Sequence, residues 1–134
     1  AWATDAAGRA QPHPGTAVAG AAQVFARVQK LIALRRATPA LIDGAYRELW
    51  RQNGAANPNV LAFARGTGAG VRIIALNNGA RASGAMRIPV RDLADGTRLV
   101  DELDDGAPAQ VTITGGVLAV DLPAKAMAIY RIAP

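Results

Sequence analysis

Short segments of alternating apolar and polar residues fill the chain after Gly44, and they constrain the fold more than any other feature. A β-strand points successive side chains to opposite faces, so a period of two predicts strands that are buried on one face. Eight such segments occur, at residues 45–50, 60–65, 71–77, 86–90, 97–103, 110–114, 117–122 and 126–132. Their spacing of roughly ten residues, with no helix between them, predicts an eight-stranded antiparallel β-sandwich with Greek-key connections.

Turn-forming residues separate these segments. Glycine, asparagine and aspartate favour tight turns because they tolerate positive φ angles. They cluster at residues 66–70, 77–79, 104–106 and 115–116, where we expect hairpin turns. The residues expected to form the core of the sandwich are Leu49, Leu61, Phe63, Ile73, Ala75, Leu99, Val111, Ile113, Leu118, Val120, Ile129 and the ring of Tyr130.

Residues 17–36 follow a helical period instead. Their apolar side chains recur every three or four residues, which places them on one face of a helix. The residues of this face are Ala21, Val24, Phe25, Val28, Leu31 and Ile32. Thr16 can cap the N-terminus through its hydroxyl, and Pro39 is expected to end the helix because it forces Thr38 into an extended conformation.

The change of period at Gly44 predicts two parts. Residues 1–16 carry prolines and glycines without a period and are predicted to be a loop. We therefore assign residues 1–44 to an N-terminal loop and amphipathic helix, and residues 45–134 to a C-terminal β-sandwich domain. The fold class is mainly β, with one N-terminal helix.

Composition excludes several kinds of site. The chain has no cysteine, which excludes disulfides and thiolate-bound metals, and its single histidine, His13, cannot form a zinc site alone. No run approaches the roughly 18 apolar residues of a membrane span. Residues 1–5 show neither the basic nor the apolar region of a signal peptide, so the compartment stays open. We expect no cofactor, no metal and no membrane partner.

The charge balance raises the question of nucleic acid, because the formal net charge is +5. The basic residues are scattered over different predicted elements, and the longest basic run is the pair Arg35 and Arg36. The few aromatic residues, 4% of the chain, are not interleaved with basic ones as a base-stacking surface requires. A solvated basic surface is the better interpretation, and we expect no nucleic-acid partner.

Three stretches were weighed as sites of chemistry. The glycine-rich residues 66–70 join two predicted strands, whereas a phosphate-binding loop must lead into a helix N-terminus, so a hairpin is favoured. The acidic residues 101–106 could serve acid–base or calcium chemistry, but they lack the EF-hand pattern, and a turn is favoured. Trp50 is a candidate sugar contact, with packing at a strand end as the alternative. No catalytic residue is predicted.

Several stretches together resemble one protein family. The residues VFARVQKLIALRRATPALIDGAYREL (24–49), VLAFARG, VRIIALNNG, GTRLVDEL and LAVDLPAKAMAIYRI are similar to the C-terminal region of α-amylase superfamily glycoside hydrolases. In that family the last helix of the catalytic barrel carries a pattern like LIxLRRxxPAL and leads into an all-β domain. The resemblance spans residues 17–132 and is nearest to the cyclomaltodextrinase and neopullulanase branches.

The resemblance implies a non-catalytic piece of such an enzyme. The family's catalytic carboxylates lie upstream of its last barrel helix, and none of their motifs occurs here, so this chain alone is predicted to be inactive. The implied role is structural support of a missing barrel in a parent enzyme that acts on α-glucans of the starch, maltodextrin, cyclodextrin or pullulan type. That parent could be periplasmic, secreted or cytoplasmic.

Two other readings of the chain stay open. One is a stand-alone carbohydrate-binding module with α-glucan as ligand, and the other is a basic domain that binds acidic partners. Without a barrel, the apolar helix face would lie in water, which predicts a homodimer through that face. The residues expected to carry this self-association are Val24, Phe25, Val28, Leu31 and Ile32.

Overall fold

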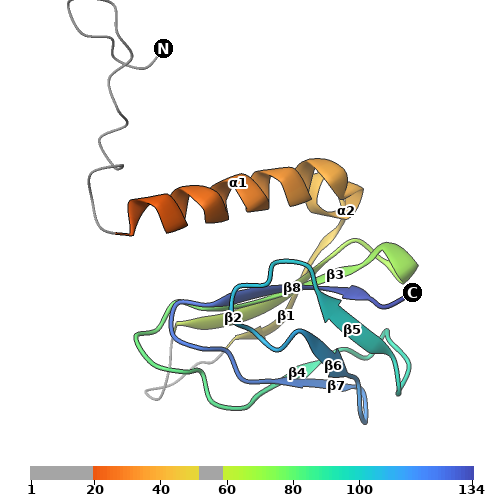
Figure 1. The fold of residues 1–134 in the computed structure, drawn as a ribbon. Coiled ribbons are helices and arrows are strands. Elements are labelled where there is room, and N and C mark those ends of the chain that lie inside the picture. Colours follow the sequence, from red (N-terminus) through yellow and green to blue (C-terminus); the bar gives the residue numbers. More distant parts are fainter. Residues whose placement is uncertain (1–19, 52–58) are drawn as a thin grey trace, which may run out of the picture. The chain divides into compact units, whose positions relative to one another are not determined.

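A computed structural model describes residues 20–51 and 59–134 (Figure 1). The chain falls into two compact units, of which the first reaches to Leu34 and the second is Arg35–Pro134. The first unit is helical where it is described, and the second contains all of the described strands. The division predicted at residues 44 and 45 stays a prediction about the domains.

The predicted helix is present as α1, Ala21–Ala37, and its proposed N-cap Thr16 lies outside the described residues. Arg35 and Arg36 occupy its last turn, where cations interact favourably with the negative end of the helix dipole. Thr38 is extended, with φ −123° and ψ 98°, so α1 ends where Pro39 was expected to end it. A second helix of one turn, α2 (Pro39–Ile42), follows and was not anticipated.

Two glycines allow α2 to lie close to the strands. A Cβ on Gly44 would stand 2.4 Å from the carbonyl oxygen of Ala40 and 2.8 Å from the backbone nitrogen of Gly66. Gly66 itself has a φ of 76°, which side chains rarely adopt. Arg65 fastens this junction, because its Nε and Nη2 donate to the carbonyl oxygens of Ala40 (3.4 Å) and Ile42 (3.3 Å). The Pro-Ala-Leu-Ile-Asp-Gly stretch therefore turns the chain from helix to strand.

All eight predicted segments contain a strand. The strands are β1 (Tyr46–Arg51), β2 (Val60–Arg65), β3 (Arg72–Asn77), β4 (Met86–Pro89), β5 (Arg98–Asp101), β6 (Gln110–Thr112), β7 (Val117–Val120) and β8 (Met127–Ile132). Six form an antiparallel sheet in the order β1-β2-β3-β8-β5-β6, and β4 pairs with β7 in a second sheet. β8 returns to pair with β3, which is the long-range pairing expected of a Greek key, and the sandwich prediction is confirmed.

The core lies between the two sheets. The fully buried side chains facing it are Val60, Ala62, Ile73, Ala75, Leu99, Ala128 and Tyr130 from the large sheet and Met86, Ile88, Leu118 and Val120 from the small one. We call the side of the six-stranded sheet that faces the small sheet its inner face, and the opposite side its outer face. Leu49, Trp50 and Val111 pack against the core but are only partly buried.

Two predicted core residues are only partly buried. Leu61 and Phe63 alternate with the buried Val60 and Ala62, so they lie on the outer face of β2. Ile129 is buried as predicted, and its alternation with Ala128 and Tyr130 places it on the outer face of β8. Both faces of these strands carry apolar residues, so alternation alone could not select the inner set.

One of the four predicted hairpin turns, at residues 77–79, instead connects the two sheets. Residues 77–79 lead from β3 of the large sheet towards β4 of the small sheet. Residues 115–116 form the predicted hairpin turn, in which Thr114 and Val117 exchange two backbone hydrogen bonds, and this second turn leads from β6 to β7. The second turn is held by Asp95, whose carboxylate accepts the backbone N–H groups of Gly115 (2.9 Å) and Gly116 (2.8 Å).

Asn77 stabilises the crossing between the sheets. Its side chain is buried at the end of β3, and its Nδ2 donates to the carbonyl oxygens of Arg81 (2.7 Å), Leu122 (3.2 Å) and Pro123 (2.9 Å). Its Oδ1 accepts from the N–H of Gly79 (2.8 Å). One amide thus joins the loop after β3 to the segment between β7 and β8.

Candidate functional site

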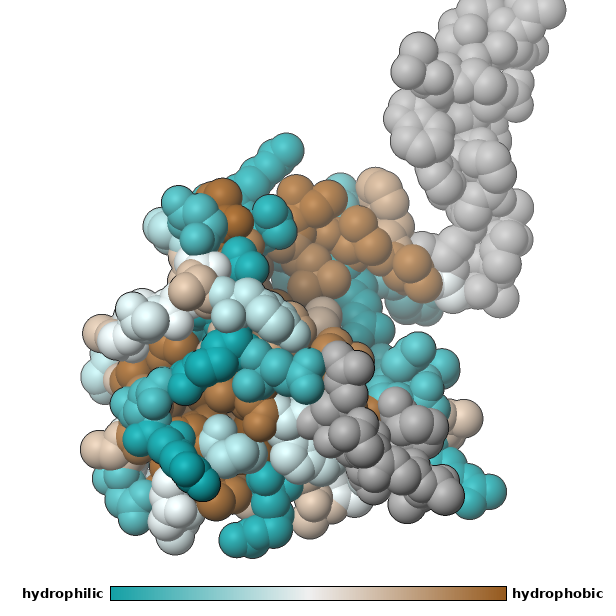
Figure 2. Space-filling model, turned by 180° about the vertical axis from the view of Figure 1, so that it is seen from behind, coloured by the Kyte–Doolittle hydropathy of each residue, from teal (hydrophilic) through white to brown (hydrophobic). Residues whose placement is uncertain are grey.

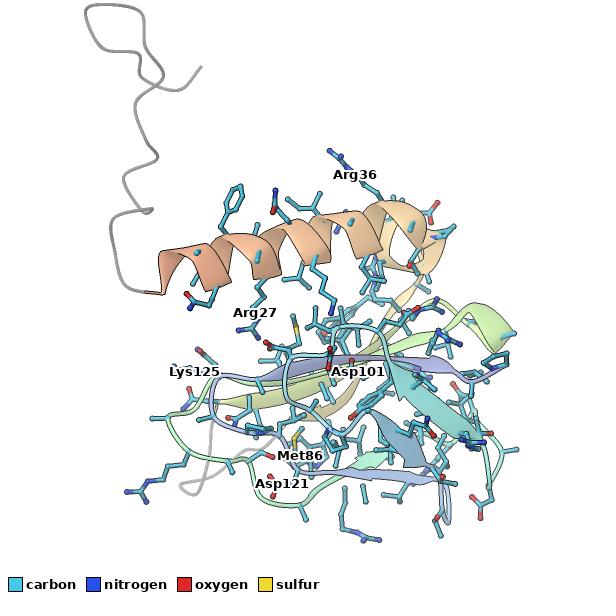
Figure 3. All side chains as sticks on the ribbon, viewed as in Figure 1. Arg27, Arg36, Met86, Asp101, Asp121 and Lys125 are labelled. Atoms are coloured by element: carbon cyan, nitrogen blue, oxygen red, sulfur yellow. The ribbon has the colours of Figure 1, made fainter. Side chains whose placement is uncertain are left out.

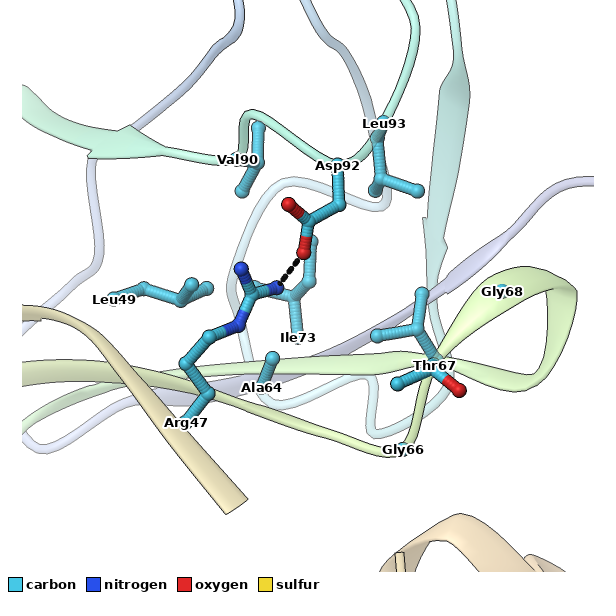
Figure 4. Close-up of a pocket in the computed structure, with 11 residues that line it drawn as sticks. Arg47, Leu49, Ala64, Gly66, Thr67, Gly68, Ile73, Val90, Asp92 and Leu93 are labelled. Atoms are coloured by element: carbon cyan, nitrogen blue, oxygen red, sulfur yellow. Dashed lines mark ion pairs between the residues drawn. The ribbon is translucent and has the colours of Figure 1, made fainter. Parts of the chain in front are cut away.

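A hollow opens at the edge of the sandwich, between β1 and the segment that follows β4 (Figure 4). Its volume is about 90 Å³. An ion pair between Arg47 Nη2 and Asp92 Oδ2 spans the opening, and both side chains are exposed. The apolar residues that line it are Leu49, Ala64, Val71, Ile73, Val90 and Leu93.

The dimensions of this hollow argue against an enzyme active site. Sites for organic ligands usually enclose about 300–1,000 Å³, several times the volume found here. The hollow contains one carboxylate, Asp92, which already pairs with Arg47. Glycoside hydrolysis needs two carboxyl groups about 5–9 Å apart on either side of a sugar. The hollow has room for water or for one small group.

The acidic stretch 101–106 forms the turn that was favoured for it. Asp101 accepts the backbone N–H groups of Leu103 (3.1 Å), Asp104 (2.8 Å) and Ile129 (2.8 Å), so its carboxylate ties β5 to β8. Asp105 accepts the N–H of Met127 at 3.2 Å. These carboxylates are used as backbone acceptors, which is a structural role.

Other carboxylates of the strand unit also have structural partners. Glu102 pairs with Arg72, Asp95 holds the turn at residues 115–116, and Asp121 accepts from the hydroxyl of Ser83 at 3.2 Å. Asp101 and Asp121 lie on different sides of the sandwich (Figure 3). Within residues 20–51 and 59–134, no three His, Cys, Asp or Glu side chains gather as a metal site would require.

The residues predicted to carry self-association lie along α1, where hydrophobic side chains gather (Figure 2). Four of them are exposed, with fractions of 63% for Val24, 58% for Phe25, 46% for Val28 and 46% for Ile32. Leu31 is half-buried. We call the four exposed residues the α1 stripe. No acidic residue lies between Gly20 and Ile42, so the charges beside the stripe are positive.

Trp50 follows an irregularity in β1. The pairing of β1 with β2 shifts between Glu48 and Trp50, and such a bulge redirects side chains. Trp50 is partly buried and packs against the core. Its assignment as a sugar contact stays a prediction. His13 and residues 1–19 lie outside the described residues.

One group of residues on the outer face of the large sheet was not predicted from the sequence. Arg65, Arg72 and Arg131 lie there beside the exposed ring of Tyr46. Strand alternation could have indicated that these arginines share the outer face, since each lies an even number of residues from an apolar residue of that face. Their alignment across strands depends on register, which the sequence does not state.

No helix in the described part of the chain has both the length and the apolar character needed to cross a bilayer.

No protein-family model matches the chain, and no curated protein matches it. Solved structures do match. The α-amylase of Geobacillus thermoleovorans, solved with acarbose, superposes with a TM-score of 0.71 at 16% identity over 99% of this chain and 27% of that one.

Two further structures give the same result. An Anoxybacillus α-amylase matches with a TM-score of 0.68 at 23% identity, covering 84% of this chain and 23% of its own. A debranching enzyme from Nostoc punctiforme matches with a TM-score of 0.65 at 28% identity, covering 92% of this chain and 25% of its own. The resemblance to α-amylase family enzymes is therefore confirmed, and the chain spans about a quarter of the length of these relatives.

Proposed function

We propose that this chain is the non-catalytic C-terminal part of an α-amylase family glycoside hydrolase acting on α-glucans, and that it supports the catalytic barrel. The observation that carries the proposal is the match of 84–99% of the chain to about a quarter of three such enzymes. The shared fold directly supports a domain of an α-amylase family enzyme. The C-terminal position in the parent enzyme, the support of its barrel and the α-glucan substrate are what we propose.

The engaged carboxylates support a non-catalytic role. Asp101, Asp95 and Asp105 accept backbone N–H groups, and Glu102 is paired with arginine. A catalytic carboxylate must instead face a substrate cleft with a second carboxylate opposite. We expect no release of reducing sugar from starch, maltotriose or pullulan. Activity above a buffer blank that survives repurification would overturn the proposal.

The α1 stripe supports a contact with a large partner. A fully buried Val, Ile or Phe side chain contributes roughly 1.5–3 kcal/mol relative to exposure, so four exposed ones leave a considerable driving force unused. In the parent enzyme we propose that the barrel covers this stripe. In its absence a second copy of the chain would cover it, giving a two-fold dimer with α1 against α1.

Sedimentation velocity at tens of micromolar tests the dimer. We expect a dimer that Phe25→Lys converts to monomer, because a charge replaces an apolar side chain of the stripe. Gln23→Lys is the matched control, since it adds the same charge to an exposed residue of α1 outside the stripe. A monomer in every variant would refute self-association. The proposed support of the catalytic barrel would then rest on the fold match alone.

The coding sequence upstream of residue 1 decides the main proposal. We expect it to encode a (β/α)8 barrel with an Asp, Glu and Asp catalytic set. A start codon close upstream, with no barrel encoded between it and residue 1, would overturn the proposed support of a barrel. It would favour the stand-alone carbohydrate-binding module. A titration with maltooligosaccharides then separates the readings, because a module predicts micromolar binding with a fluorescence change that Trp50→Phe removes.

A further inference from the structure

The peptide between Asn78 and Gly79 carries chemistry that the proposed function does not use. It lies at the start of the crossing from β3 towards β4. The backbone nitrogen of a residue that follows asparagine can attack the side-chain Cγ of that asparagine and close a succinimide ring. Glycine hinders this attack least, because it has no Cβ and its backbone adopts more conformations than that of other residues. Both reacting atoms belong to one chain, so a change of conformation is enough to bring them together.

Asn78 is accessible to the water that this reaction consumes. It is exposed, whereas the preceding Asn77 is buried. Asn77 also uses both ends of its side-chain amide in the hydrogen bonds described above, and the residue that follows it has a Cβ. Of the two adjacent asparagines, Asn78 is therefore the one that is open to reaction.

Asn77 restrains the attacking nitrogen. The N–H of Gly79, a buried residue, donates to Asn77 Oδ1 at 2.8 Å. The nitrogen must lose this proton before it attacks, and it would then face the lone pairs of Oδ1 without a hydrogen bond between them. Three hydrogen bonds from Asn77 Nδ2 hold the amide in this position. Cyclisation in the folded chain therefore requires that the bond between Gly79 and Asn77 breaks first.

Lys125 acts on the other reacting group and is labelled in Figure 3. Its Nζ donates to Asn78 Oδ1 at 3.2 Å and to the carbonyl oxygen of Asn78 at 2.7 Å. Its backbone N–H donates to the carbonyl oxygen of Gly79 at 3.2 Å. A cation at the amide oxygen withdraws electrons from Cγ and stabilises the negative charge that forms on that oxygen during the attack. Lys125 thus favours the step that Asn77 opposes.

We propose that Asn78 is a site of spontaneous deamidation, with Asn77 slowing the reaction and Lys125 assisting it. The Gly79 nitrogen gives its proton to hydroxide and forms a bond with Asn78 Cγ. The bond between Cγ and Nδ2 then breaks, and Nδ2 leaves as ammonia after taking a proton from water, which restores the hydroxide. Water finally adds to either carbonyl of the succinimide and yields aspartate or isoaspartate. No group is oxidised or reduced.

The two products should affect the fold differently. Aspartate keeps the path of the backbone and places a carboxylate beside Lys125, whose ammonium can pair with it. Isoaspartate routes the backbone through Cβ and Cγ, which lengthens it by a carbon atom and moves the Gly79 N–H away from Asn77 Oδ1. Only the isoaspartate form is therefore expected to loosen the crossing between the sheets.

Peptide mapping by mass spectrometry, after incubation of the folded chain in mildly alkaline buffer, tests the proposal. Chromatography separates aspartate from isoaspartate at the position of Asn78. We expect conversion that is slower than in a synthetic peptide of residues 76–81, in which the Asn77 amide is not held by the fold. Asn59 is the internal control and should stay intact, because the β-branched Val60 follows it.

Two variants separate the contributions. Asn77→Ala should speed the conversion of Asn78 about fivefold, which corresponds to roughly 1 kcal/mol for the lost hydrogen bond. Lys125→Met keeps a side chain of similar length but removes the ammonium, and it should slow the conversion by a similar factor. Leu99→Ala controls for a general loss of stability, because this fully buried residue lies on β5, which pairs with β6 and β8.

Three results would contradict the proposal. No detectable conversion of Asn78 in the folded chain, under conditions that convert the peptide, would mean that Asn78 is not a site. Equal acceleration by Leu99→Ala and Asn77→Ala would mean that unfolding, rather than the contact with Asn77, sets the rate. An unchanged rate in Lys125→Met would refute the assistance by Lys125.

Discussion

On β3, Ile73 and Ala75 point between the two sheets, whereas Arg72 and Ile74 point to the outer face of the same sheet. The inner set is apolar and completes its contacts within the sandwich. The outer set mixes arginine, glutamate and an exposed tyrosine with the buried side chains of Ile74 and Ile129. The comparison teaches that the apolar contacts between the two sheets lie on the inner face, whereas the outer face combines buried apolar side chains with paired charges.

The largest expected effect lies on the inner face. Ile73→Ala should lower the free energy of unfolding by about 2–5 kcal/mol, because it removes a fully buried side chain and leaves a cavity. Leu61→Ala, on the half-buried outer face, should cost less. Urea midpoints measure both, with Arg81→Ala as the exposed control, expected within about 0.5 kcal/mol. Equal shifts for all three would contradict the difference between the faces.

Asn77 tests whether a polar residue at the inner end of β3 can matter as much as packing. Asn77→Ala should cost about 1–3 kcal/mol, because the buried N–H of Gly79 loses its acceptor and three carbonyl oxygens each lose one donor. Faster hydrogen exchange at the Gly79 amide should accompany the loss. The neighbouring Asn78→Ala, at an exposed residue, serves as the control, and an equal cost there would disprove the role of Asn77.

Tyr130 adds a pH dependence to the inner face. Burial and, secondly, the nearby Asp101 raise the pKa of Tyr130 well above its ordinary value of 10.0, and its hydroxyl donates to the carbonyl oxygen of Pro108 at 3.0 Å. A pKa raised by folding gives stability that is complete below pH 10 and is lost as the pH rises further.

Between pH 10 and 11 this residue should cost about 1 kcal/mol of unfolding free energy, since only the unfolded chain ionises there. Tyr130→Phe should show a correspondingly shallower fall, while the other alkaline groups contribute equally to both proteins. Chemical denaturation at several pH values measures the slopes. Parallel slopes would mean that Tyr130 ionises normally in the folded state.

The smallest expected effects come from two ion pairs, one on the outer face and one at the hollow beside β1. Glu102→Gln should cost about 1 kcal/mol, because it leaves Arg72 and Arg131 side by side without their carboxylate, and added salt should reduce the difference. Asp92→Asn, which breaks the exposed pair with Arg47, should cost less than about 0.5 kcal/mol. Thermal unfolding at low and high salt compares the two, and a salt-independent loss would rule out an electrostatic cause.

Sequence patterns predicted much of the architecture from local chemistry. The helix, its end at Thr38 and Pro39, and all eight strand segments followed from period and turn residues. The patterns did not reveal α2, and they assigned Leu61 and Phe63, which lie on the outer face, to the core. Strands such as IIALN are apolar on both sides, so alternation could not say which side faces the second sheet.

The candidate surfaces divide in the same way. The α1 stripe was readable from helical spacing, because positions three and four apart share a face whatever the helix packs against. The alignment of Arg65, Arg72 and Arg131 on the outer face was not readable, since these residues are separated by up to 66 positions and meet only through strand register.

The sequence by itself thus determined the elements, the turns and the apolar helix face, because each depends on backbone preferences and on neighbours within a few residues. The tertiary structure decided which turns cross between sheets, which face of each strand is buried and which charges become neighbours. Those outcomes depend on hydrogen bonding between distant segments, as in the pairing of β3 with β8 and the bonds of Asn77 to residues 122 and 123. A local pattern cannot specify such pairings, because several registers would satisfy it equally well.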